Sequence, residues 1–216
     1  VAGSTAGDSI TSGGDNNTLV GTNAGTAITT GDNNTAFGYL ASRVITTGSN
    51  NVSVGAGGNL GANTTGANNT ALGYASLGAN TTASNNIAVG LSALGANTTG
   101  SLNTAVGFEA LLTNTTASHN TATGFKALRL NTTGSSNIAV GSDALAVNTT
   151  GSKNTVSRLV PDDVGLFSYQ NTISHELFSL RLMLQPFNNN TTIIHGLLTP
   201  APEEEDRLAS LLHYNT

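Results

Sequence analysis

The chain has 216 residues, of which 26 are glycine, 33 are threonine and 27 are asparagine. Charged residues make up only 9% of it, and the formal net charge is −5. This composition argues against a coiled coil and against nucleic-acid binding through positive charge. The lack of cysteine excludes disulfides and cysteine-ligated metal sites. No apolar run approaches the roughly 20 residues that cross a bilayer, so we expect no membrane span.

The composition changes near residue 155, because all four prolines and the single methionine lie after it. We therefore expect three parts. Residues 1–16 are a degenerate first coil or an N-terminal cap, residues 17–155 are a repeat domain, and residues 156–216 are a capping or assembly segment.

The repeat domain has a unit of 17 residues, and NTAVGFEALLTNTTASH at residues 103–119 is its clearest copy. Each copy holds a glycine four residues after an asparagine, and one 18-residue spacing indicates an extra residue in the Gly57–Asn59 stretch. The glycines predicted at coil corners are Gly21, Gly38, Gly55, Gly73, Gly90, Gly107, Gly124 and Gly141. The asparagines predicted to form a ladder are Asn17, Asn34, Asn51, Asn69, Asn86, Asn103, Asn120 and Asn137.

This unit length predicts the fold class. A 17-residue unit is too short for a helical hairpin repeat or a propeller blade. It fits one coil of a parallel β-solenoid, in which neighbouring strands are about 4.8 Å apart. The sequence therefore predicts an all-β solenoid or β-roll of about eight coils.

Alternation of side-chain size within each strand predicts two different faces. In Thr104-Ala105-Val106 and its counterparts, we expect the bulky side chains to point into the coil. The small alanine side chains would then form a contact face between chains.

A second short element, such as Ala110-Leu111, is expected to fill the other side of the core, and an Asn-Thr-Thr corner follows it. Stacked asparagines and threonines can form hydrogen-bonded ladders. The same asparagines are also glycosylation sequons, although corner chemistry is the preferred interpretation. These possible acceptors are Asn63, Asn80, Asn97, Asn114, Asn131 and Asn148.

Signals of catalysis or of cofactor and metal binding are weak. His119, His175, His195 and His213 show no metal-ligand spacing. No GxSxG elbow is present, and the glycine-rich Gly55–Gly61 stretch lacks the Gly-Lys-Ser/Thr ending of a phosphate loop. We expect no enzyme activity, no cofactor and no metal.

The C-terminal segment follows other rules. Leu177–Leu184 suits a helix or a strand equally, residues 191–198 suit a strand, and an acidic helix start follows Pro202. The segment is interpreted as a cap or an interaction segment, or as a tail that docks on a neighbouring subunit.

The units NNTALGYASLGANTTAS and NTAVGFEALLTNTTAS resemble the head repeats of trimeric autotransporter adhesins and related repeats of phage tail fibres and bacterial surface fibre proteins. The resemblance covers residues 17–155. It implies a left-handed parallel β-roll, three chains around one axis, and an extracellular location on a cell surface or virion. It also implies binding to itself, and a host-surface receptor or glycan as a further partner.

Three functions are compatible with these observations. The first is a structural, non-enzymatic fibre or adhesin segment that forms a homo-oligomer. The second is an extracellular filament that polymerises end to end, with the tail bridging subunits. The third is an ice-binding solenoid that uses its regular threonines.

Overall fold

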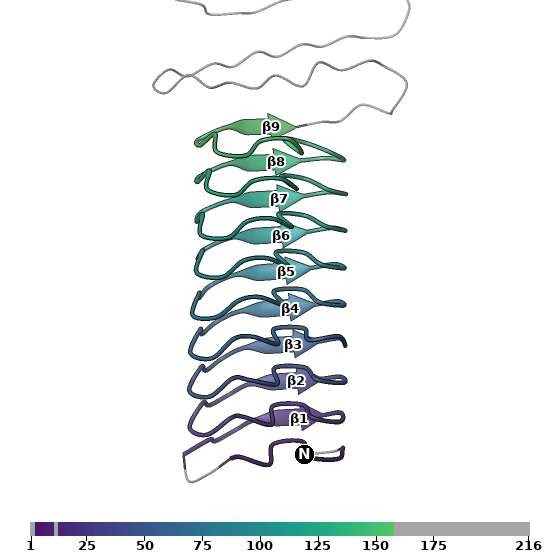
Figure 1. Cartoon of the computed structure of the whole chain (residues 1–216), viewed down its shortest axis with the longest axis vertical. Coiled ribbons are helices and arrows are strands. Elements are labelled where there is room, and N and C mark those ends of the chain that lie inside the picture. Colours follow the sequence, from purple (N-terminus) through teal and green to yellow (C-terminus); the bar gives the residue numbers. More distant parts are fainter. Residues whose placement is uncertain (1–2, 11–12, 158–216) are drawn as a thin grey trace, which may run out of the picture. The chain divides into compact units, whose positions relative to one another are not determined.

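The computed structural model describes residues 3–10 and 13–157. These residues form a parallel β-solenoid with one nine-stranded sheet, in which each strand pairs with the next in chain order. Figure 1 shows the strands stacked above one another, with the chain returning around each coil to the next strand. The predicted all-β solenoid of about 17 residues per coil is confirmed. The strands are β1 Thr18–Val20, β2 Thr35–Phe37, β3 Val52–Val54, β4 Thr70–Leu72, β5 Ile87–Val89, β6 Thr104–Val106, β7 Thr121–Thr123, β8 Ile138–Val140 and β9 Thr155–Ser157.

The strands pair in the register of the sequence repeat. Thr104 of β6 pairs with Thr121 of β7, and Val106 pairs with Thr123. Equivalent residues of successive coils therefore form straight rows along the stack. Before β1, residues 3–10 add a partial coil, since the N–H of Gly7 donates to the carbonyl oxygen of Ala24 at 3.0 Å.

The two faces of the sheet are the reverse of the sequence prediction. Ala105, in the middle of β6, is fully buried, whereas Val106 is 36% exposed. The reason lies on the return segment, where Leu94 and Leu111 are also fully buried and fill the space beneath the sheet. Only a small side chain fits between these leucines and the strand. The prediction that the bulky row points inward and the alanine row outward was therefore wrong.

In the first coil, the large side chain comes from the strand and the small residue from the return segment. Leu19 stands in the middle of β1 and is fully buried. Gly25 stands where later coils have leucine, and a Cβ atom added there would lie 2.7 Å from Cδ2 of Leu19. In these coils the large side chain comes from one wall and a small residue faces it from the other, which keeps the core volume nearly constant. The second coil differs, because Ala36 and Ser42 are both small there and Ile45 at the corner is the large buried side chain.

The predicted elements of the tail lie outside the described residues. This applies to Leu177–Leu184, to residues 191–198, to the helix expected after Pro202, and to three of the histidines. The described chain includes only residues 156 and 157 of the C-terminal segment.

Candidate functional site

The first asparagine ladder runs beside the start of the sheet. Oδ1 of Asn103 accepts a hydrogen bond of 2.9 Å from the backbone N–H of Asn120, one coil further along. Nδ2 of Asn103 donates to the carbonyl oxygen of Ala117 at 2.9 Å, at the corner of its own coil. The backbone bond to Oδ1 recurs between successive members from Asn17 to Asn154. The ladder joins each coil to the next without using charge.

A second asparagine ladder lies at the Asn-Thr-Thr corners. Nδ2 of Asn97 donates to Oδ1 of Asn80 at 3.0 Å and to the carbonyl oxygen of Gly100 at 2.9 Å. Beside it, Oγ1 of Thr98 donates to the carbonyl oxygen of Thr115 at 2.9 Å. The side-chain amides of these sequons are therefore already used within the fold. The fully buried members are Asn63, Asn80, Asn97, Asn114 and Asn131, and Asn148 is half-buried.

The corner glycines form a row in which backbones touch. Gly107 has φ of +138°, and an added Cβ atom would lie 2.7 Å from the carbonyl carbon of Gly124 in the next coil. Residues with a side chain rarely adopt this φ. The row therefore needs glycine both for its backbone conformation and for the close approach of neighbouring coils.

The outer face of the sheet is an uncharged surface on which large apolar side chains lie among threonines. We call it the outer strand face, and it consists of the first and third residues of β1–β9 together with the residue after each corner glycine. None of these positions between residues 18 and 157 carries Asp, Glu, Lys or Arg. Its large exposed side chains are Phe37, Tyr39, Val52, Leu72, Tyr74, Ile87, Leu91, Val106, Phe108, Phe125, Ile138 and Val140.

Two aromatic rings stack on this face at the sixth and seventh coils. The rings of Phe108 and Phe125 stack with centroids 5.3 Å apart and planes 11° apart. Nζ of Lys126 lies 4.8 Å from the centroid of Phe125 and 5.9 Å from that of Phe108. These distances fit a cation–π contact at the edge of the face.

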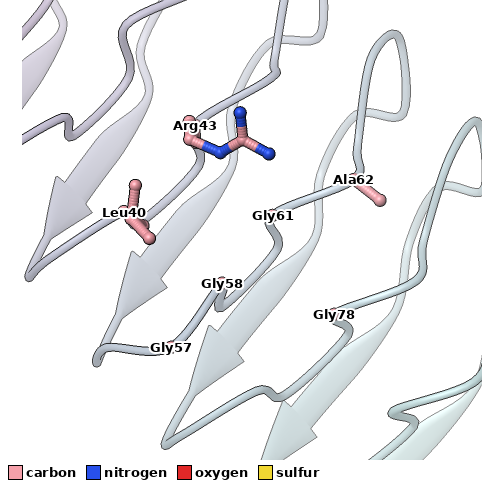
Figure 2. A pocket seen from close by; sticks show the side chains of 7 residues that line it. All are labelled: Leu40, Arg43, Gly57, Gly58, Gly61, Ala62 and Gly78. Carbon is pink, nitrogen blue, oxygen red and sulfur yellow. The ribbon is translucent and has the colours of Figure 1, made fainter.

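The extra residue of the third coil opens a shallow hollow of about 360 Å³. Figure 2 shows Arg43 reaching toward the coil of Gly58 and Gly61, with Leu40 on the same coil as Arg43. In the core of the same coil, Asn59 stands where most other coils have alanine, and its Nδ2 donates to Oγ of Ser76 at 2.6 Å. The sequence prediction of one extra residue thus corresponds to a local change of both surface and core.

Left-handed backbone conformations are a feature that the sequence reasoning missed. Among the described residues, 24 non-glycine residues have φ between +48° and +63°. They form three rows, one of which carries Asn16, Asn33, Asn50, Asn68 and Asn85. Asparagine tolerates this conformation better than most residues, so its recurrence just before the first ladder was the available signal.

No arrangement typical of catalysis or metal binding is found in the part of the chain that the structure describes. There, no group of three or more His, Cys, Asp or Glu side chains could hold a metal ion. His119 is exposed and continues the row of left-handed residues, with φ of 63°. Within the same residues, no helix is long and apolar enough to cross a membrane.

Comparison with known proteins gives no relative: no family model, no curated protein and no solved structure matches the chain.

Proposed function

We propose that the chain is a structural, non-enzymatic fibre segment whose copies pack together through the outer strand face. Three copies around one axis, and a place on a cell surface or virion, follow from the resemblance to trimeric adhesin and tail-fibre repeats. The apolar, charge-free outer strand face is the observation that carries the proposal.

Parallel sheets support the expectation that this face is covered. Such sheets occur almost only with both faces packed, and monomers rarely expose large contiguous apolar patches. Here the inner face packs on the core, while Leu72, Ile87 and Val106 on the outer face are between 36% and 45% exposed. A covering partner would remove these side chains from water.

A second copy of the same chain is the occupant that matches the geometry. The apolar rows repeat at the spacing of neighbouring strands, about 4.8 Å. A partner that packs along the whole face needs the same axial repeat, and another copy supplies it over nine strands. The lack of charge fits too, because like charges brought together in a symmetric assembly would repel.

Static light scattering on the purified full chain tests this proposal with two matched double variants. Ile87→Lys with Val106→Lys places two charges on the outer strand face. Thr82→Lys with Thr99→Lys places two charges at exposed corners of the adjoining coils. We expect the first variant to be monomeric and the second to keep the oligomeric mass of the parent. Equal masses for both variants would reject the outer strand face as the interface. A mass that keeps rising with protein concentration would favour the end-to-end filament.

An ice-binding role has one observation in its favour. The second threonine of each Asn-Thr-Thr corner is exposed, and the equivalent residues form a row of eight: Thr30, Thr47, Thr65, Thr82, Thr99, Thr116, Thr133 and Thr150. Within the described coils, no second row of free threonine hydroxyls lies beside it. The hydroxyls of the neighbouring threonines, such as Thr81 and Thr98, donate to backbone carbonyl oxygens of the next coil. The test is thermal hysteresis of the parent chain and of the double variant Thr82→Lys with Thr99→Lys. Hysteresis in the parent that the double variant lacks would support this role. A parent chain without hysteresis would reject it.

A further inference from the structure

Arg43 is an isolated charge. It is the only charged residue between Asp32 and Glu109, and it is exposed. Within residues 3–10 and 13–157, no ion pair or hydrogen bond of its guanidinium group is recorded. Its guanidinium group is therefore available to an anionic ligand.

The hollow beside Arg43 lies where the repeat changes. The row that carries Tyr39 and Tyr74 has only Ala56 in the coil between them. A Cβ atom on Gly57 would lie 2.5 Å from Cζ of Tyr74, so this ring packs against Gly57, which lines the hollow. An added Cβ atom on Gly58 would meet no atom within 4 Å. The extra residue and the missing side chain thus leave open space beside the guanidinium.

The backbone of this coil also has free donors. In later coils, the N–H groups at the equivalent position donate to the preceding coil, as Ser92 does to the carbonyl oxygen of Tyr74 at 2.9 Å. For Gly57 and Gly58, the described part of the chain contains no such bond. Both residues are left-handed, with φ of 70° and 77°. Successive N–H groups in turns of this kind can form concave anion sites.

We propose that this hollow binds the carboxylate of an acidic sugar residue. Arg43 would hold the carboxylate through charge-assisted hydrogen bonds, and the N–H groups of Gly57 and Gly58 would share it. The sugar ring would lie against Leu40, Ala62 and the glycine backbone. A volume of about 360 Å³ is larger than a simple anion needs, and the lining is mostly apolar with a single charge. None of the residues that line the hollow belongs to the outer strand face.

The test is a nitrogen-15 NMR titration of the full chain with glucuronic acid, with glucose and acetate as comparison ligands. We expect shifts at the amides of Gly57 and Gly58 with glucuronic acid and a dissociation constant of about 1 mM, typical of one small polar ligand. Glucose should bind at least about tenfold more weakly, because it lacks the charge partner of Arg43. Acetate should also bind more weakly, because it lacks the ring.

Matched variants separate the site from the rest of the surface. Arg43→Gln should weaken binding at least about tenfold, whereas Arg129→Gln, at the same position of a later coil without the hollow, should leave it unchanged. Gly58→Asp should abolish binding by placing a carboxylate in the hollow, and Gly58→Asn should keep it. Circular dichroism shows whether each variant is folded.

Several results would overturn the proposal. These are an absence of shifts at Gly57 and Gly58 in the parent chain, equal affinity in the parent and Arg43→Gln, and equal binding of glucose and glucuronic acid. Acetate binding as tight as glucuronic acid would mean a simple anion site and would reject the sugar. None of these results depends on the oligomeric mass, so they leave the proposed fibre function to its own test.

Discussion

Nδ2 of Asn97 donates a hydrogen bond of 3.0 Å to Oδ1 of Asn80, its counterpart one coil earlier. Oδ1 of Asn97 in turn accepts one of 2.9 Å from Nδ2 of Asn114. All three side chains are fully buried. The ladder therefore satisfies polar groups in the core by passing the same bond from coil to coil.

Replacing one member by aspartate tests how strongly the fold depends on this ladder. Asn97→Asp removes the donor to Asn80 and to Gly100 and places a carboxylate against two acceptor oxygens. We expect it to lower the free energy of unfolding by about 3–5 kcal/mol, the range for an uncompensated buried charge. Urea unfolding measures the effect. Asn85→Asp, on an exposed residue, is the control, and similar losses in both variants would contradict a special role for the ladder.

The corner glycines allow a comparison between two rows of the same solenoid. Gly107→Ala introduces a Cβ atom against the backbone of Gly124 at a φ of +138°. Gly95→Ala lies in another row, where an added Cβ atom would meet no atom nearer than 3.1 Å and Leu112 occupies the equivalent position of the next coil. We expect a loss of at least about 2 kcal/mol for Gly107→Ala and within about 0.5 kcal/mol of the parent for Gly95→Ala. Thermal unfolding compares them, and a harmless Gly107→Ala would show that the corner can relax.

Leu102 is a residue whose replacement should stabilise the chain. It is half exposed and has φ of 61°, in the row whose earlier members are Asn16, Asn33, Asn50, Asn68 and Asn85. Leu102→Asn should raise the free energy of unfolding by about 0.5–1 kcal/mol, because asparagine adopts the left-handed conformation at lower cost. Leu102→Ala keeps that cost and should give no gain. Chemical denaturation of both variants decides the matter, and a destabilised Leu102→Asn would contradict the explanation.

Two buried serines should respond to substitution in opposite directions. Oγ of Ser42 has no hydrogen-bond partner among the described residues, whereas Oγ of Ser76 accepts from Nδ2 of Asn59 at 2.6 Å. Ser42→Ala should stabilise the chain by about 1 kcal/mol, since it removes an unpaired buried hydroxyl. Ser76→Ala should lower the free energy of unfolding by about 1–2 kcal/mol, because the amide of Asn59 loses this hydrogen-bond acceptor. Hydrogen exchange of the neighbouring coils reports both effects locally, and equal signs would contradict this account.

The sequence predicted the coil length, the rows and the position of the extra residue, because each follows from spacing alone. It did not predict which face of the strand points inward. Alternation in Thr104-Ala105-Val106 shows that two faces exist, but the choice between them depends on how much space Leu94 and Leu111 leave beneath the sheet. The left-handed conformation of those leucines was also missed, with φ of 51° and 52°, because it is imposed by the closed coil rather than by local preference.

The sequence did not predict the hollow beside Arg43, for a related reason. The extra residue was visible as a spacing of 18, and it was interpreted only as a bulge. That the bulge opens toward a charged side chain of the preceding coil depends on stacking, which brings together residues that are 17 or 18 apart in the chain.

The molar mass of the full chain in solution, measured by light scattering at several concentrations, tests the central claim most directly. Packing of copies through the outer strand face predicts a stable multiple of the 21.7 kDa chain mass, and three copies if the resemblance to trimeric fibres holds. A constant mass of 21.7 kDa at all concentrations would contradict the claim, because the apolar face would then be stable in water without a partner.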